Sequence, residues 1–197
     1  MKITVIGAGN SGIAMAAHLS KEGNEVTLWN RTRSSIEKLM RTHIIRCEGV
    51  VSGNIPIHLV TDDINVALKD PDIVMITTPA NSHKELAEVI AKNINKSTII
   101  VLNPGRTFGA FEFNKKYDQI IAETQTIIYT CRKIDEDAVN IIAFKDNVLI
   151  SSLGMYSNES IMDYLPECIQ NYFMPAHSMI QTSIGNVGMV LHCAPLL

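Results

Sequence analysis

The sequence contains little that would suit nucleic acid or a membrane. Its 17 lysines and arginines are outnumbered by 20 aspartates and glutamates, which gives a net charge of −3, so no basic excess favours nucleic acid as a partner. No apolar run approaches the roughly 18 residues that span a bilayer. The first predicted strand begins at residue 2, which leaves no room for a signal peptide. These absences predict a cytoplasmic protein.

Cysteine and charge are also scarce. The chain has four cysteines, and 19% of its residues are charged. The cysteine spacing matches no metal-ligand pattern, so we expect no metal site and, without an export signal, reduced thiols. By contrast, 46% of the 197 residues are hydrophobic, which is typical of a globular protein with a sizeable core. The cysteines are Cys47, Cys131, Cys168 and Cys193.

A glycine motif near the N-terminus is the most informative stretch. The apolar, β-branched run 3–6 predicts a strand, the small and apolar run 13–19 predicts a helix, and the turn between them has the spacing G-x-G-x-x-G. In a dinucleotide-binding unit Gly7 allows the tight turn, Gly9 lets the backbone approach a pyrophosphate, and Gly12 lets helix and strand pack closely. The phosphates would lie on free N–H groups at the helix N-terminus. The predicted cofactor ligands here are Gly7, Gly9, Asn10, Ser11 and Gly12.

The end of the second predicted strand, 25–29, bears on the choice of cofactor. A carboxylate at this point would bind the ribose 2′-OH of NAD, whereas an arginine suits a 2′-phosphate. The segment is Asn30-Arg31-Thr32-Arg33-Ser34, which has no carboxylate. It therefore favours NADP(H), with NAD(H) as the alternative, and places Asn30, Arg31 and Thr32 at the cofactor. Both arginines would also be explained as solvated charges that open a helix at 34–44, Arg33 more readily than Arg31.

Two more buried-type strands, 72–76 and 98–102, end in polar loops. Ligands lie beyond the C-terminal ends of strands in open parallel sheets, so Thr78, Pro79 and Asn103 are expected to line the cofactor groove. Arg106 is a candidate partner for a substrate carboxylate, or equally a surface arginine. His83 is expected at the surface, in the first turn of a helix at 83–93.

The rest of the chain departs from regular strand–helix alternation. Gly53-Asn54 predicts a hairpin within 47–60, and the acidic pair at 62–63 predicts the cap of a short helix. Strand-like runs at 120–124, 127–132, 139–144 and 148–151 predict an added, partly antiparallel extension of the sheet. The fold class is therefore α/β, with a Rossmann-type, doubly wound, mostly parallel sheet. Helices are expected at 158–165 and at 178–194.

Along nearly its whole length the chain resembles the NAD(P)-dependent octopine/nopaline (opine) dehydrogenase family. The first matching motif, Gly7 to Gly12, is common to many dehydrogenases, and the other motifs are more specific. They are Thr78-Pro79-Ala80-Asn81, Asn103-Pro104-Gly105-Arg106-Thr107-Phe108-Gly109, Glu123-Thr124-Gln125-Thr126 with Tyr129-Thr130-Cys131-Arg132, and Gly185-Asn186-Val187 with His192-Cys193-Ala194-Pro195.

The resemblance implies a Rossmann domain followed by an all-helical domain that closes over the substrates. It implies condensation of an amino acid with a 2-keto acid and reduction of the resulting imine by NAD(P)H. His192 matches the family's catalytic histidine, which acts with an aspartate of the helical domain; without the resemblance it would be read as a helix-packing histidine. Arg106 and Thr126 are candidates for the keto-acid carboxylate, and Glu123 is a structural strand-end carboxylate.

These implications divide the chain into a cofactor domain at 1–175 and the first helix of a truncated helical domain at 176–197. We therefore expect cofactor binding without turnover, and a homodimer that associates through residues 178–197. Two other functions stay open. One is a reductase of the ketopantoate reductase or glycerol-3-phosphate dehydrogenase type, and the other is a non-catalytic NADP-binding module.

Overall fold

The computed structural model describes residues 1–105, 108–153 and 157–185. In this part of the chain the main element is an eight-stranded sheet with the order β12-β11-β8-β7-β6-β1-β2-β5. In this order every neighbouring pair is parallel except β11 and β8, which are antiparallel. The chain order reverses between β1 and β6, the point at which such sheets bind ligands. The strands are β1 (Lys2–Ile6), β2 (Glu25–Trp29), β5 (Leu59–Thr61), β6 (Ile73–Ile76), β7 (Ile99–Leu102), β8 (Ile121–Thr124), β11 (Val148–Leu153) and β12 (Phe173–Pro175).

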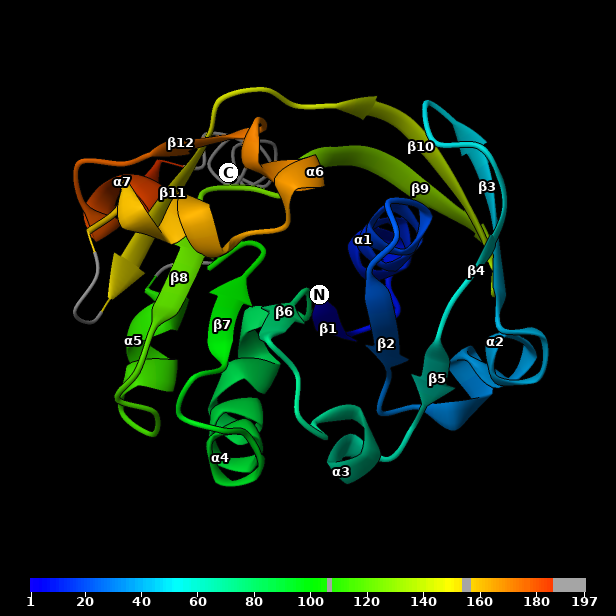
Figure 1. Cartoon of the computed structure of the whole chain (residues 1–197), viewed down its shortest axis with the longest axis horizontal. Coiled ribbons are helices and arrows are strands. Elements are labelled where there is room, and N and C mark those ends of the chain that lie inside the picture. The colour runs from blue at the N-terminus through cyan, green and yellow to red at the C-terminus, as the bar shows by residue number, and fades with distance from the viewer. Residues whose placement is uncertain (106–107, 154–156, 186–197) are drawn as a thin grey trace, which may run out of the picture.

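Helices cover both faces of this sheet (Figure 1). Ile3 and Val5 of β1 belong to the core that includes α1, whereas Ile6 belongs to the core beneath α3, α4 and α5. Because successive residues of a strand point to opposite faces, one apolar run fills both cores. The helices are α1 (Asn10–Lys21), α2 (Glu37–Thr42), α3 (Ile64–Ala67), α4 (His83–Asn93), α5 (Gly109–Asn114), α6 (Glu167–Gln170) and α7 (Met179–Ile184), and the 3-10 helices are Arg33–Ser35, Ala80–Ser82 and Ser160–Tyr164.

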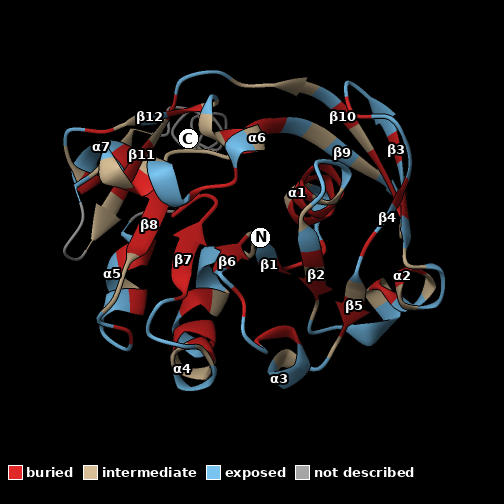
Figure 2. Cartoon of the chain, in the orientation of Figure 1, coloured by how far each residue is buried: buried red, intermediate tan, exposed pale blue. Residues whose placement is uncertain are grey.

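A second sheet, with the order β4-β3-β10-β9, lies over α1. It joins the hairpin β3 (Ile44–Gly49) and β4 (Gly53–Pro56) to a later pair, β9 (Tyr129–Asp135) and β10 (Ala138–Phe144). Helix α1 is thereby enclosed between two sheets, and every residue from Gly12 to Leu19 is buried (Figure 2). This explains why the sequence of α1 is apolar on all sides rather than on one stripe.

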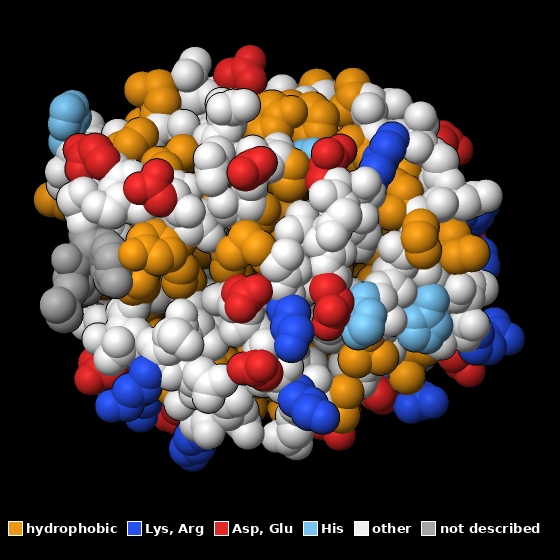
Figure 3. Space-filling view, viewed as in Figure 1, with side chains coloured by type: hydrophobic (Ala, Val, Ile, Leu, Met, Phe, Trp, Pro, Cys, Tyr) orange, Lys and Arg blue, Asp and Glu red, His pale blue; other side chains and the backbone are white. Residues whose placement is uncertain are grey.

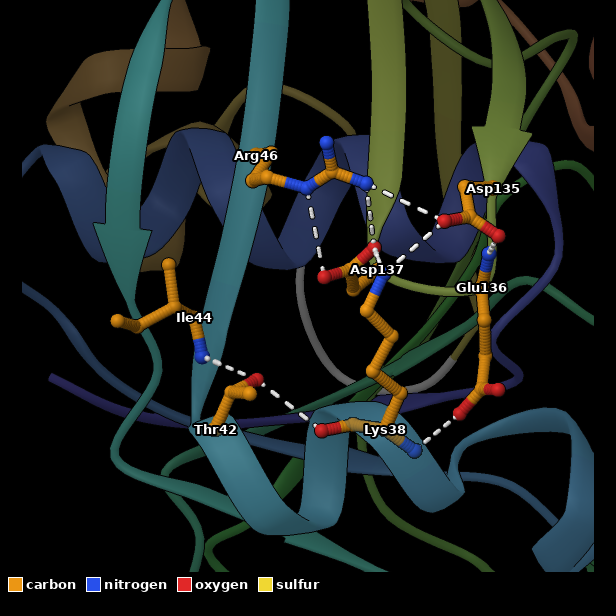
Figure 4. Close-up of polar contacts among 7 residues, drawn as sticks. All are labelled: Lys38, Thr42, Ile44, Arg46, Asp135, Glu136 and Asp137. Atoms are coloured by element: carbon orange, nitrogen blue, oxygen red, sulfur yellow. Dashed lines mark hydrogen bonds and ion pairs between the residues drawn. The ribbon is translucent and has the colours of Figure 1, made fainter.

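A network of charged side chains fastens the second sheet to α2 (Figure 4). The buried carboxylate of Asp137 accepts hydrogen bonds from Arg46 Nη2 at 2.9 Å and from Lys38 Nζ at 2.8 Å. Asp135 accepts from the same two side chains, at 3.0 Å from Lys38 and 3.2 Å from Arg46. The network therefore joins β3, the β9–β10 turn and α2.

On the face of the molecule viewed in Figure 3, charged side chains of both signs are interspersed.

The structure confirms the predicted parallel strands and the helix cap, since Asp63 Oδ1 accepts from Asn65 N at 2.9 Å. A hairpin is present within 47–60, but Gly53 and Asn54 are not its turn: they pair with Cys47 and Arg46 as part of β4, and the turn is at 50–52. The predicted extension of the sheet is correct only for β8 and β11. The runs at 127–132 and 139–144 form β9 and β10 of the second sheet instead, because their inner faces cover α1.

Three further expectations change. His83 is buried rather than at the surface, since its ring packs edge-on against Phe113 of α5 and its Nε2 lies 3.3 Å from Thr78 O. The helix expected at 158–165 is the 3-10 helix Ser160–Tyr164. Of the helix expected at 178–194, the described residues contain α7, and the remainder lies outside them. Within the described ranges, no helix combines the length and apolar character needed to cross a membrane.

Candidate cofactor site

The glycine turn after β1 is shaped by its neighbours. Gly7 has φ +106°, and a Cβ added there would lie 2.9 Å from Thr78 Cγ2. A Cβ on Gly12 would lie 1.7 Å from the carbonyl oxygen of Gly7, closer than any side chain permits. A Cβ on Gly9 would meet nothing within 4 Å. Gly7 and Gly12 are thus required by packing, whereas Gly9 faces open space where a ligand can approach.

The N-terminus of α1 presents unpaired backbone donors to that space. Gly9 caps the helix without a side-chain hydrogen bond, and the first helical bond runs from Ile13 N to Gly9 O at 3.0 Å. The N–H groups of Asn10, Ser11 and Gly12 therefore have no acceptor within the helix. Together with the partial positive charge of the helix end, they form a site suited to an anion such as a diphosphate.

Asn30, predicted as a cofactor ligand, holds the turn in place. Its Oδ1 accepts from Ala8 N at 3.1 Å, and its Nδ2 donates to Thr32 O at 3.0 Å. Gly7 N also donates to Trp29 O at 2.8 Å. The end of β2 is thus tied to the glycine turn, and the carboxamide of Asn30 is engaged with the protein at both ends.

Two pockets flank the turn and share Thr78 and Pro79. The first, of about 410 Å³, we call the Asn103 pocket. The second, of about 470 Å³, we call the Arg31 pocket, and it lies at the end of β2. Both open at the C-terminal ends of parallel strands beside the point where strand order reverses, as expected for a dinucleotide. The Asn103 pocket is lined by Ser11, Thr77, Thr78, Pro79, Ala80, Asn103, Pro104, Thr126 and Ile127.

The Arg31 pocket contains three predicted cofactor residues, Asn30, Arg31 and Thr32. Arg31 is exposed and pairs with Glu85 of α4, with Nη1 and Oε2 3.1 Å apart. Arg33 pairs with Asp62 at 3.3 Å and is not among the residues that line the pocket. Of the two arginines, Arg31 is therefore the one that borders the pocket.

The Asn103 pocket brings together residues that follow β6, β7 and β8. Asn103 is buried, and its Nδ2 donates to Val101 O at 3.0 Å, so its side chain shapes the loop. Thr126 lines the same pocket and its Oγ1 lies 3.4 Å from Lys145 Nζ. Partial burial lowers the pKa of Lys145. The predicted substrate ligand Arg106 and the predicted catalytic His192 lie outside the described residues.

Glu123 of β8 is completely buried beside the loop that follows β7, in line with the structural role expected for it. It accepts hydrogen bonds from Ala110 N at 3.1 Å and Thr182 Oγ1 at 2.9 Å, and also from Ser183 Oγ. A Cβ on Gly105 would lie 2.3 Å from its Oε2. The carboxylate thus joins β8, α5 and α7 behind the Asn103 pocket.

Two residues at the glycine turn come from the second sheet and were not predicted as ligands. Lys133 Nζ lies 3.3 Å from Ala8 O, and Lys133 N donates to Asn10 Oδ1 at 2.8 Å. Cys131 Sγ lies 3.4 Å from Asn10 O. The pattern around 127–135 gave no local sign of this contact, because it arises from the packing of β9 against α1.

Comparisons with known proteins agree with this geometry. Residues 2–134 match the family described as NAD-dependent glycerol-3-phosphate dehydrogenase N-terminus. The opine dehydrogenase of Arthrobacter sp. (strain 1C) is 32% identical over 204 residues, which cover 98% of this chain and 55% of that protein. An octopine dehydrogenase structure with NADH and pyruvate has a TM-score of 0.81 at 16% identity, covering 96% of this chain and 53% of that one. An NADP+-bound yersinopine dehydrogenase has a TM-score of 0.77 at 15% identity, covering 98% and 51%.

The chain spans about half the length of these relatives. The family match and the relative from Arthrobacter confirm the predicted resemblance to opine dehydrogenases, and the structural neighbours confirm the Rossmann-type fold. The chain therefore belongs to the family of the NAD-dependent glycerol-3-phosphate dehydrogenase N-terminus and, over 98% of its length, is a homologue of opine dehydrogenase.

Proposed function

We propose that this chain is the cofactor-binding part of an NADP-dependent opine-type dehydrogenase, which joins an amino acid to a 2-keto acid by reductive condensation. One observation carries the proposal: the anion site at the N-terminus of α1 and the two pockets that flank the glycine turn lie in a chain 32% identical to an opine dehydrogenase over 98% of its length. Because the chain spans about half of that relative, the activity is proposed for a longer protein that contains it.

The preference for NADP(H) rests on Arg31. Its guanidinium stands at the end of β2 in the Arg31 pocket, where charge-assisted hydrogen bonds to a 2′-phosphate are available. Asn10, Ser11 and Gly12 would take the diphosphate, and Thr78, Pro79 and Asn103 would border the path to the Asn103 pocket. The pocket at the end of β7 and β8 would then receive the nicotinamide and the keto acid.

The residues divide the chemistry between them. The amine attacks the keto carbon, water leaves, and the resulting imine must be protonated before it accepts a hydride. NADPH, when bound, supplies that hydride. His192 is the proposed acid for the imine nitrogen, because a histidine titrates near neutral pH. Thr126 and Arg106 are proposed to hold the keto-acid carboxylate, and Lys145 Nζ, 3.4 Å from Thr126 Oγ1, adds a positive charge at the same place.

Binding and turnover test the proposal separately. Titration of residues 1–197 with NADPH and NADH should give tighter NADPH binding. Oxidation of NADPH with pyruvate and a panel of amino acids should occur with a protein extended by a helical domain, and not with residues 1–197. Appreciable turnover by residues 1–197 would contradict the proposed division of labour, and failure to bind either coenzyme would overturn the function itself.

A second candidate is a reductase that acts on a keto acid or keto-phosphate without an amine. The match of residues 2–134 to the glycerol-3-phosphate dehydrogenase N-terminus favours it. The same assay without amino acid decides between the two. Reduction of the keto substrate in the absence of amine would replace the opine-type reaction with this one.

We also propose self-association through the C-terminal part of the chain. Ile180 and Ile184 are 59% and 57% exposed and lie one turn apart on α7, so they form an apolar stripe that a second copy can cover. Sedimentation of the wild type should show a dimer that weakens in Ile180→Ser/Ile184→Ser. Monomeric wild-type protein at high concentration would contradict this.

A further inference from the structure

Strand β9 lies along α1, and two contacts about as far apart on the strand as on the helix join them. Tyr129 Oη is 3.1 Å from His18 Nδ1, and Lys133 N is 2.8 Å from Asn10 Oδ1. Positions 129 and 133 are about 13 Å apart in a strand, and positions 10 and 18 are about 12 Å apart in a helix. The core packing of Tyr129 thus determines that Lys133 reaches the N-terminus of α1.

Lys133 is fastened to the glycine turn by two contacts. Its backbone N–H holds the side-chain oxygen of Asn10, which turns that carboxamide toward β9. Its ammonium lies 3.3 Å from Ala8 O, between the first two glycines of the motif. Gly9, the next residue, faces open space. The ammonium is therefore beside the opening through which a diphosphate would reach the free N–H groups of α1.

The ammonium of Lys133 has no counter-ion among the residues that the structure describes. Each carboxylate that forms an ion pair in this part of the chain does so with another cation. Asp135 and Glu136 are the carboxylates whose charges stabilise the ammonium of Lys133 from a distance. However, Asp135 pairs with Lys38 and Arg46, and Glu136 accepts a hydrogen bond from Lys38 N. Burial lowers the pKa of Lys133, and the positive end of α1 is adjacent. A bound anion would offset both the burial of this charge and its repulsion by the positive end of α1.

We propose that Lys133 binds the diphosphate of the dinucleotide, from the side opposite the N–H groups of α1. The inference rests on the proposed cofactor binding and adds to it a ligand supplied by the second sheet. The second sheet thus contributes to the cofactor site, through the contacts of β9 with the glycine turn.

The experiment must separate diphosphate binding from a purely structural role, in which the ammonium of Lys133 only holds Ala8 O. Lys133→Gln separates them, because an amide can still donate to Ala8 O but carries no charge. Lys133→Arg retains the charge. Lys69→Gln removes one charge from an exposed residue that precedes β6, at the edge of the sheet opposite the pockets, and is the matched control.

The probe is ADP-ribose, which carries the diphosphate and no nicotinamide, titrated by calorimetry into residues 1–197. Lys133→Gln should weaken binding about tenfold or more, as expected for a charge-assisted hydrogen bond. Lys133→Arg should stay within about threefold of the wild type, since the charge is kept. Lys69→Gln should match the wild type. Thermal unfolding of the ligand-free variants should coincide with that of the wild type.

A second measurement does not depend on the folding of Lys133→Gln. As the pH rises, the lysine loses its charge and an arginine does not, so the wild type should lose affinity for ADP-ribose in alkali more steeply than Lys133→Arg. Equal affinities of wild type and Lys133→Gln, or equal pH profiles of wild type and Lys133→Arg, would overturn the role of Lys133 and leave cofactor binding intact. A wild type that binds neither ADP-ribose nor NADPH would overturn the proposed function.

Discussion

Arg31 and Glu85 line the same pocket and form an ion pair, with Nη1 and Oε2 3.1 Å apart. Both side chains are exposed, so the pair contributes little to stability. The pair matters instead for cofactor binding. A 2′-phosphate that binds Arg31 must displace the carboxylate of Glu85, and it is repelled by the negative charge of that carboxylate. The two residues are therefore expected to have opposite effects on NADPH.

We expect Arg31→Ala to weaken NADPH binding about tenfold through the loss of a charge-assisted contact, with little change for NADH. Glu85→Gln should strengthen NADPH binding severalfold, because repulsion and competition are removed. Arg33→Ala, which removes an arginine outside the pocket, is the control. Fluorescence titration of both coenzymes measures these effects. Equal losses for NADPH and NADH in Arg31→Ala would refute a contact with the 2′-phosphate.

The glycines of the turn separate stability from binding. A Cβ on Gly12 would lie 1.7 Å from Gly7 O, so Gly12→Ala should destabilise the fold by about 3 kcal/mol or more. Gly9→Ala meets nothing within 4 Å and should change the free energy of unfolding by about 0.5 kcal/mol at most. It should nevertheless weaken ADP-ribose binding, because its methyl group occupies the approach to the turn. Urea unfolding and calorimetry provide the two readouts, and undiminished binding by Gly9→Ala would argue against this approach.

The sequence could predict the parallel half of the fold because its signals are local. Buried β-branched runs and the spacing of Gly7, Gly9 and Gly12 depend on neighbouring residues alone. The second sheet could not be predicted in this way, since β10 pairs with β3 through contacts such as Val139 with Cys47. No local pattern records a pairing between segments so distant in the chain.

The same distinction applies to the site. Residues that follow strand ends, such as Thr78 and Asn103, were predicted and lie together in one pocket. Lys133 and Lys145 were missed because they reach the site only through the packing of the second sheet. His83 was placed at the surface because polar first-turn residues usually face water, but here Phe113 covers it.

Asp137 should make stability depend on pH in the acid range. Hydrogen bonds from Arg46, followed by those from Lys38, lower its pKa to about 2. A depressed pKa in the folded state means that the contribution is complete above the unfolded value of about 3.9 and is lost as the pH falls through about 2. Asp137→Asn should cost about 1–2 kcal/mol at pH 6, and its difference from the wild type should shrink at pH 3. The exposed Asp163→Asn is the control, and a difference independent of pH would contradict this assignment.

His18 should give a second dependence, nearer neutral pH. The ring is buried among Tyr129, Phe144 and Tyr172, with Nδ1 3.1 Å from Tyr129 Oη, and burial lowers its pKa. The unfolded chain then binds the proton first, at about pH 6.5. Stability is complete above that value and is lost as the pH falls from it toward the folded-state pKa, by at most about 1.4 kcal/mol for each pH unit. Urea unfolding between pH 7 and pH 5 should show this loss in the wild type and in the exposed control His58→Gln, and a smaller loss in His18→Gln. Equal slopes in all three proteins would mean that folding does not lower the pKa of His18, and that the packing of β9 on α1 is insensitive to acid.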